Sequence, residues 1–398
     1  MVAAFLSVGA MAEEARNPGA RPEVGKPIQA AIDLLKHKRA RDALAKVREA
    51  QSVGNLTPYE NYLVQQLLAQ AAAAAGDAGT AARAFESVAG MSAAPDAHRR
   101  QFLAAAVGQY YAAKEYGKAA DLAARYLRDG GDKSVRAIYI QSLYLGNNFG
   151  AAARAIAQDV ESDEQAGRAP SEELLQLLAS AYNQQKDAAG YARAMEKLVA
   201  YHPKKDYWLS VIHGIVARPG YADRLNIDLA RLKIAAGVMR TADEYVEAAQ
   251  LSLQDGFPME ATKIIDQGYA AGLLGAGPEA ERHKRLKDLA AKTLAEDKAA
   301  LARDEAQDAA GKEGKTLFNE GFNYVLHGKT AKGLQMMEQG LKLATGFRRP
   351  EHAKLQLAYG YHLAGQNQKA IQVFRSVHGT DGAASIARLW VIRLGRAS

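Results

Sequence analysis

The chain has 398 residues, of which 48% are hydrophobic but only 7% aromatic, and it contains no cysteine. This length allows two or three domains or one elongated array, and the absence of cysteine excludes disulfides, thiolate metal sites and a cysteine nucleophile. The net charge of +7 is spread over interspersed residues, and short basic runs such as Arg348-Arg349 carry no nucleic-acid-binding motif. We interpret those runs as solvated helix surface and expect no nucleic-acid partner. Because alanine is the best helix former and is depleted in sheets, the composition favours an all-α fold.

The first residues resemble the end of a signal peptide. Residues 1–12 are uncharged and apolar and finish with Ala10-Met11-Ala12, the small-residue pattern that signal peptidase cleaves. No lysine or arginine precedes them, and the apolar run is too short to span a bilayer as a helix. We expect a signal remnant that ends at Ala12 and therefore a periplasmic protein, with a buried N-terminal helix of a cytoplasmic protein as the alternative.

A linker is expected over residues 13–27, because each proline in Asn17–Pro27 disfavours helix at the residue before it. Beyond this linker, no segment approaches eighteen uninterrupted apolar residues. The mature chain is therefore predicted not to be embedded in a membrane.

One pattern of small and large residues recurs along the rest of the chain. Its clearest copy consists of Leu357, Ala358, Tyr361, Gly365, Ala370, Phe374 and Val377. Two antiparallel helices joined by a turn at Gly365 explain this spacing, since small residues allow the backbones to approach and large ones fill the space between them. Counting two weaker copies, the sequence predicts roughly ten helix–turn–helix units.

These units divide the chain into segments. We expect an N-terminal array over 28–204, a degenerate helical unit over 205–241, one unit over 242–275, a charged helical unit over 276–313, C-terminal units over 314–380 and an apolar capping helix over 381–398. One long helix over Glu279–Asp308 is the alternative for the charged segment.

The spacing resembles the tetratricopeptide repeat, a helix–turn–helix of about 34 residues, from Val24 to Val377. Only Trp208 approaches the early tryptophan of that repeat, and most units are longer. The resemblance implies a right-handed α-solenoid whose inner wall is built from the first helix of each unit. In addition, Leu198–Trp208, Gly256–Leu274 and Arg348–Arg375 are similar to stretches of exported proteobacterial repeat proteins that commonly accompany TonB–ExbB–ExbD type components.

No combination of residues typical of catalysis is found. The nine histidines include no H-E-x-x-H zinc motif, and neither a phosphate-binding loop nor a serine-hydrolase elbow is present. Gly275–Ala280 formally matches G-x-G-x-x-A but lies between helical segments, so we interpret it as a turn. We therefore expect a non-enzymatic protein with no catalytic residues, no cofactor and no metal.

The resemblance also implies which positions of each first helix contact a partner. Transferred to this chain, they are Gln66, Gln70, Gln101, Tyr111, Lys133, Arg136, Gln176, Ser180, Asp243, Gln250, Lys315, Phe322, His352, Tyr359 and His362, with Asn183 and Gln184 from adjoining positions. Glutamine, asparagine and tyrosine suit a groove that hydrogen-bonds an extended peptide or a partner helix. Ordinary exposed helix surface is the alternative at each position.

The leading hypothesis is a periplasmic scaffold that binds protein or peptide partners, including TonB-, ExbB- or ExbD-like components. A cytoplasmic adaptor and a scaffold for envelope polysaccharide export are the alternatives. We expect a monomer or a weak homo-oligomer.

Overall fold

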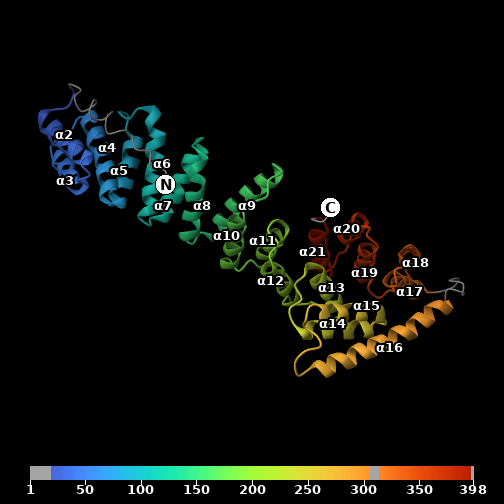
Figure 1. Cartoon of the computed structure of the whole chain (residues 1–398). Helices are drawn as coiled ribbons and strands as arrows, with labels where there is room; N and C mark the ends of the chain where they lie inside the picture. The colour runs from blue at the N-terminus through green and yellow to red at the C-terminus, as the bar shows by residue number, and fades with distance from the viewer. Residues whose placement is uncertain (1–18, 305–312, 396–398) are drawn as a thin grey trace. The chain divides into compact units, whose positions relative to one another are not determined.

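The computed structural model describes residues 19–304 and 313–395, and throughout these residues the regular secondary structure is helical (Figure 1). The predicted all-α fold of helix pairs is confirmed. Among the described helices, none is long and apolar enough to cross a bilayer. The expected signal remnant over residues 1–12 and the first linker residues, 13–18, lie outside the described residues. The chain forms two compact units: the first extends to Ala169 and includes Leu177–Ala188, and the second comprises Pro170–Gln176 and the residues from Ala189 onward.

The first unit is a stack of antiparallel helix pairs. Its helices are α2 (Pro22–Lys36), α3 (Ala40–Gln51), α4 (Pro58–Ala75), α5 (Ala78–Gly90), α6 (Asp96–Ala112), α7 (Tyr116–Arg128), the 3-10 turn η1 (Lys133–Val135), α8 (Arg136–Leu145), α9 (Phe149–Gln165) and most of α10 (Glu172–Gln184). Each helix from α2 to α8 packs against the next one along the chain. Alanines such as Ala31, Ala43 and Ala72 are fully buried, because only small side chains allow the backbones to approach so closely.

The linker predicted over residues 13–27 extends too far, because α2 already begins at Pro22. Proline suits the first position of a helix, where its missing N–H has no partner in any case. Pro27 lies inside α2 and costs one backbone hydrogen bond. Burial of Val24, Ile28 and Ile32 against the core offsets that cost.

The second unit contains more varied helices. They are most of α11 (Ala188–Tyr201), α12 (Lys205–Val216), the 3-10 turn η2 (Asp223–Leu225), α13 (Asn226–Ala236), α14 (Ala242–Gln254), α15 (Pro258–Ala270), α16 (Ala280–Asp304), α17 (Gly314–Leu326), α18 (Thr330–Leu343), α19 (Pro350–Leu363), α20 (Asn367–Arg375) and α21 (Ala383–Gly395). Gly365 forms the predicted turn between α19 and α20, with a φ of 74°. Helices α17 and α18 approach most closely, since a Cβ atom on Gly333 would lie 2.5 Å from the carbonyl oxygen of Gly321.

The charged segment forms a single helix of 25 residues, α16, and not a helix–turn–helix unit (Figure 1). Its sequence holds no glycine or proline that would end a first helix. The buried His283, Leu286 and Ala290 recur at helical spacing and pack one face of α16 against the unit. Farther along, Asp297 accepts hydrogen bonds from Asn323 of α17 (2.8 Å) and from His327, the C-cap of that helix (2.6 Å). The number of units is therefore smaller than the predicted ten.

The last helix closes the second unit instead of merely capping it. Helix α21 packs against α20, as a cap would, but also against α13 and α19. The N–H of Ala222 donates to the carbonyl oxygen of Asp381 (3.0 Å), and the Nε of Arg393 donates to that of Ala235 (2.8 Å). Helices α13 to α21 are thus joined at both ends, and a pocket lies among them.

Candidate binding pocket

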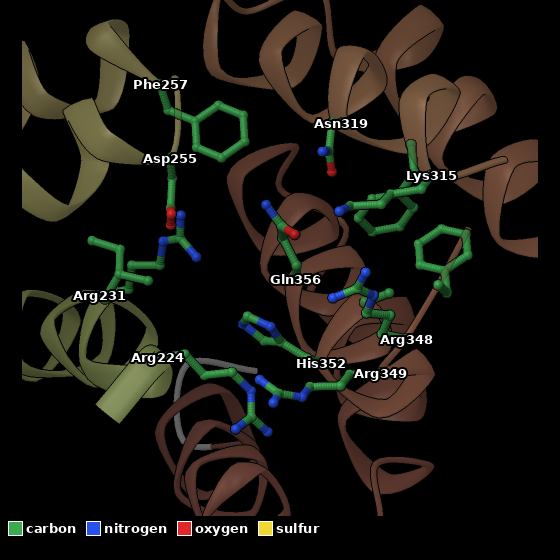
Figure 2. A pocket seen from close by; sticks show the side chains of 14 residues that line it. Arg224, Arg231, Asp255, Phe257, Lys315, Asn319, Arg348, Arg349, His352 and Gln356 are labelled. Carbon is green, nitrogen blue, oxygen red and sulfur yellow. The ribbon is translucent and has the colours of Figure 1, made fainter. Parts of the chain in front are cut away.

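A cavity of about 420 Å³ lies in the second unit, between segments that are far apart in the sequence (Figure 2). Its polar lining consists of Arg224, Arg231, Asp255, Lys315, Asn319, Arg348, Arg349, His352 and Gln356. Its apolar lining consists of Ile227, Phe257, Phe318, Phe347 and Ala353. Five basic side chains therefore share the cavity with one carboxylate.

The helix ends around the pocket add to this positive character. Lys315, Phe318 and Asn319 come from the N-terminal part of α17, and His352 and Ala353 from that of α19. Phe257 is the N-cap of α15, whereas Asp255 is the C-cap of α14. The N-terminus of a helix carries a partial positive charge from its unpaired N–H groups. A positive charge close to a helix N-terminus destabilises the helix. Lys315 and Arg349 therefore do not stabilise α17 and α19, and their presence needs another explanation.

Three of the basic side chains are available to a ligand. Lys315, Arg348 and Arg349 are exposed, and within the described residues the structure shows no ion pair for any of them. Figure 2 shows all three side chains around the opening in which Gln356 and His352 lie. Arg224 differs, because its guanidinium is paired with Asp381 just before α21.

Arg231 forms the floor of the pocket and is bound on all sides. Its Nε and Nη2 donate to the two oxygens of Glu260 at 2.8 and 2.7 Å, and its Nη1 donates to Asp228 at 2.9 Å. The guanidinium also lies over the rings of Phe322 (5.2 Å) and Tyr359 (5.0 Å). Because its donors point to protein carboxylates, Arg231 fixes the floor and is not available to a ligand.

The ionisation of the floor follows from these contacts. Burial opposes the charged form of Asp228, but hydrogen bonds from His352 (2.8 Å) and Arg231 outweigh it, so the pKa of Asp228 lies below its ordinary value. Burial also opposes the charge of Arg231, and the carboxylate of Glu260 overcomes it, so the pKa of Arg231 is raised. The floor is thus one cation between two carboxylates, a charged but internally paired cluster.

Aromatic rings form the apolar wall. Phe318 is buried and meets the half-buried Phe347 edge to face, with ring centroids 5.5 Å apart. Phe257 meets Phe322 in the same way at 4.9 Å. Such pairs hold one another in place, so the part of Phe347 that remains exposed is a fixed apolar surface beside Arg348.

The structure brings two of the sequence-predicted residues, Lys315 and His352, into this pocket, and it places Tyr359 beneath its floor. Two others are corrected: Phe322 is fully buried and Gln66 is 3% exposed, so neither offers a surface to a partner. Both face inward because the first helix of a unit packs on two sides. Several more make contacts within the chain: Arg136 with Asp159, Ser180 with Tyr144, Gln176 with Tyr207 and His362 with Asn367.

The remaining predicted positions lie outside the pocket: Gln70, Gln101, Tyr111, Lys133, Asn183, Gln184, Asp243 and Gln250. Sequence reasoning missed Arg224, Arg348, Arg349, Phe347, Asn319 and Gln356. The signal for two of them was the Arg348-Arg349 run directly before Pro350, which the charge pattern alone assigned to ordinary surface.

The described residues thus form an all-α fold of helix pairs, with a pocket among the helices of the second unit. No protein-family model and no curated protein sequence matches the chain. Solved structures similar to it include yeast Tom70 (12% identity, 91% of this chain and 94% of that chain, TM-score 0.25) and the P58(IPK) TPR domain (13% identity, 94% and 97%, TM-score 0.22). The maize pentatricopeptide repeat protein PPR10 is also similar (13% identity, 93% and 55%, TM-score 0.26). At these TM-scores no residue of this chain is equated with a residue of those proteins.

Proposed function

We propose that the protein is a non-enzymatic protein–protein interaction scaffold that holds a segment of a partner protein in the pocket of its second unit. The observation that supports this most strongly is the set of exposed cations Lys315, Arg348 and Arg349, which have no ion-pair partner among the described residues and lie beside a fixed apolar wall. Charged groups without an internal partner on rigid elements are suited to recognition, because little entropy is lost when they bind.

The chemistry of the lining agrees with binding and not with catalysis. The carboxylates of the floor, Asp228 and Glu260, are held in ion pairs with Arg231, so they are not placed to exchange protons with a ligand. His352 is engaged with Asp228 through its Nε2. What faces the opening is a set of hydrogen-bond donors and aromatic surface, which bind and orient.

For location and partners, we propose the periplasm and a TonB-type energy-transduction system. The A-x-A sequence at Ala10–Ala12 supports export. The stretches Gly256–Leu274 and Arg348–Arg375, which are similar to exported repeat proteins that accompany TonB–ExbB–ExbD components, support the partner class. Cell fractionation with N-terminal sequencing tests the location: a mature N-terminus at Glu13 in the periplasm is expected, and an intact Met1 in the cytoplasm would refute it.

Cross-linking followed by affinity capture of the full chain from the native cell-envelope fraction tests the scaffold role. We expect one or a few envelope proteins to be captured by the wild type and largely lost from the double variant Arg348→Gln, Arg349→Gln. The matched control is Lys284→Gln, Arg285→Gln, which removes two exposed charges from α16 outside the pocket. Capture that is the same with all three proteins would show that the pocket is not the binding site.

A further inference from the structure

We infer that the pocket of the second unit selects an acidic polypeptide segment in which carboxylates flank an apolar or aromatic side chain. This inference rests on the proposed function and names the chemistry of the partner that the same pocket recognises.

The charged groups of the pocket lining that have no ion-pair partner among the described residues determine which charge a ligand should carry. Among the residues that the structure describes, Asp255 is the one carboxylate in the lining, and desolvation raises its pKa against the opposing effect of Arg231. Opposite it are Lys315, Arg348 and Arg349, together with the positive ends of α17 and α19. These groups favour an anion, and arginine favours planar carboxylates through its paired donors.

The floor determines where the anion lies. Arg231 is outnumbered by Asp228 and Glu260, all three of which are buried. An anion pushed to the floor would meet that excess of negative charge, whereas at the opening it meets Lys315, Arg348 and Arg349. The ligand therefore crosses the opening as a segment and does not enter the pocket end-on as a single compact anion.

The origin of the donors in two separate segments favours several carboxylates over one phosphate. Lys315 comes from α17, whereas Arg348 and Arg349 come from the segment that precedes α19. Asn319 and Gln356 lie among them in Figure 2. An amide side chain both donates and accepts hydrogen bonds, as the peptide group does, so this arrangement suits a polypeptide backbone with acidic side chains on either side.

The apolar wall of the pocket favours a ligand with an apolar or aromatic side chain between its carboxylates. Phe347 is half-buried beside Arg348, and Phe318 supports it from behind. An apolar side chain of the ligand would cover the exposed part of Phe347 while neighbouring carboxylates reach the cations. The cavity of about 420 Å³ is near the lower end of the range for ligand sites, roughly 300–1,000 Å³, and fits a few residues of a chain.

Fluorescence anisotropy with the full-length protein tests this directly. The probe is a fluorescein-labelled peptide with two glutamates on each side of a phenylalanine, and its comparison peptides carry glutamine for glutamate or serine for phenylalanine. We expect the glutamate peptide to bind at least about tenfold more tightly than the glutamine peptide, since charge-assisted hydrogen bonds are the stronger class. Replacing phenylalanine by serine should weaken binding several-fold, and raising the salt concentration should weaken it further.

The pocket variants give the matched comparison. The double variant Arg348→Gln, Arg349→Gln should bind the glutamate peptide roughly tenfold or more weakly than the wild type. The control variant Lys284→Gln, Arg285→Gln on α16 should change the affinity less than twofold. The charge-reversal variant Arg348→Glu, Arg349→Glu should bind the same peptide with lysine in place of glutamate, a gain that a loss of folding cannot produce.

Equal binding of the glutamate and glutamine peptides would overturn the inference, and so would equal weakening by the two glutamine variants. Inorganic phosphate or an acidic polysaccharide that displaces the peptide at the same charge concentration would overturn it in favour of a general anion site. If an envelope protein is captured through the pocket but the glutamate peptide does not bind, the acidic specificity fails and the scaffold role stands. If Arg348→Gln, Arg349→Gln leaves envelope capture unchanged, the proposed function itself fails.

Discussion

Removal of the buried arginine beneath the pocket should destabilise the second unit strongly. In wild type Arg231 is 4% exposed, and Asp228 and Glu260, which it pairs with, are 2% and 4% exposed. The substitution Arg231→Met keeps most of the side-chain volume between Phe322 and Tyr359 but takes away three hydrogen bonds to carboxylates.

The size of this loss in stability depends on the hydrogen bonds that Asp228 and Glu260 retain in the variant. Asp228 keeps the hydrogen bond from His352, whereas Glu260 keeps only a hydrogen bond of 3.3 Å from Ser252. Each lost charge-assisted hydrogen bond contributes about 1.5–3 kcal/mol. We therefore expect a loss of about 3–5 kcal/mol, the usual cost of breaking a buried ion pair by removing one partner.

Tryptophan fluorescence during urea unfolding measures this loss in the second unit alone. The chain contains two tryptophans, Trp208 and Trp390, which are 4% and 2% exposed and both belong to the second unit. A two-unit chain need not unfold in one step, so a probe confined to one unit gives the cleaner free energy of unfolding. The urea midpoint should shift to clearly lower concentration with little change in slope.

The control is Arg388→Met, also in the second unit. Arg388 pairs with Glu196 at 3.2 Å, but its side chain is 50% exposed, so its loss should cost at most about 1 kcal/mol. If Arg231→Met were no more destabilising than Arg388→Met, the cluster would not contribute to stability in the way described.

Two further predictions concern other parts of the chain. Glu60 caps α4 and accepts hydrogen bonds from Arg21, which lower its pKa to about 2, so Glu60→Ala should cost about 1–2 kcal/mol at pH 7. Since the folded pKa is depressed, this contribution is complete above the ordinary pKa near 4.5 and is lost as the pH falls towards 2. Hydrogen exchange of α2 amides in wild type and variant at each pH measures the difference, and a constant difference would contradict it. Gly333→Ala should destabilise by about 1–3 kcal/mol or more because the new Cβ would meet the carbonyl oxygen of Gly321. Gly214→Ala, where no atom lies within 4 Å, should instead stabilise by up to about 1 kcal/mol in the same tryptophan-monitored titration.

The helix pairs could be predicted from the sequence because their signals are local. The turn at Gly365 and the small residue Ala358 lie within one pair, and their spacing alone specifies two packed helices. The same local reasoning failed at Pro22–Pro27. Two prolines predict an extended segment there, but the first occupies a position that tolerates proline and the second is compensated by burial against other helices.

The closure of the second unit had no local signal. The apolar stretch that forms α21 was identified as a terminal cap, and its packing on α20 agrees with that. The segment before α21 is also joined to the segment before α13 by the pair Arg224–Asp381 and by the hydrogen bond from Ala222 to Asp381, which link residues more than 150 positions apart. A single sequence contains no information on such pairings.

The same limit explains why the candidate site was found only in part. Lys315 and His352 were identified because they occupy first-helix positions, and the same rule selected Phe322, which the fold buries. Arg231 and Arg349 show the reason. Both are arginines that line the pocket, yet Arg231 is held by two buried carboxylates and fixes the floor, whereas Arg349 is exposed and has no carboxylate partner among the described residues. The difference lies in Glu260, which comes from another helix, so the function of an arginine in this pocket depends on which acids the fold brings to it.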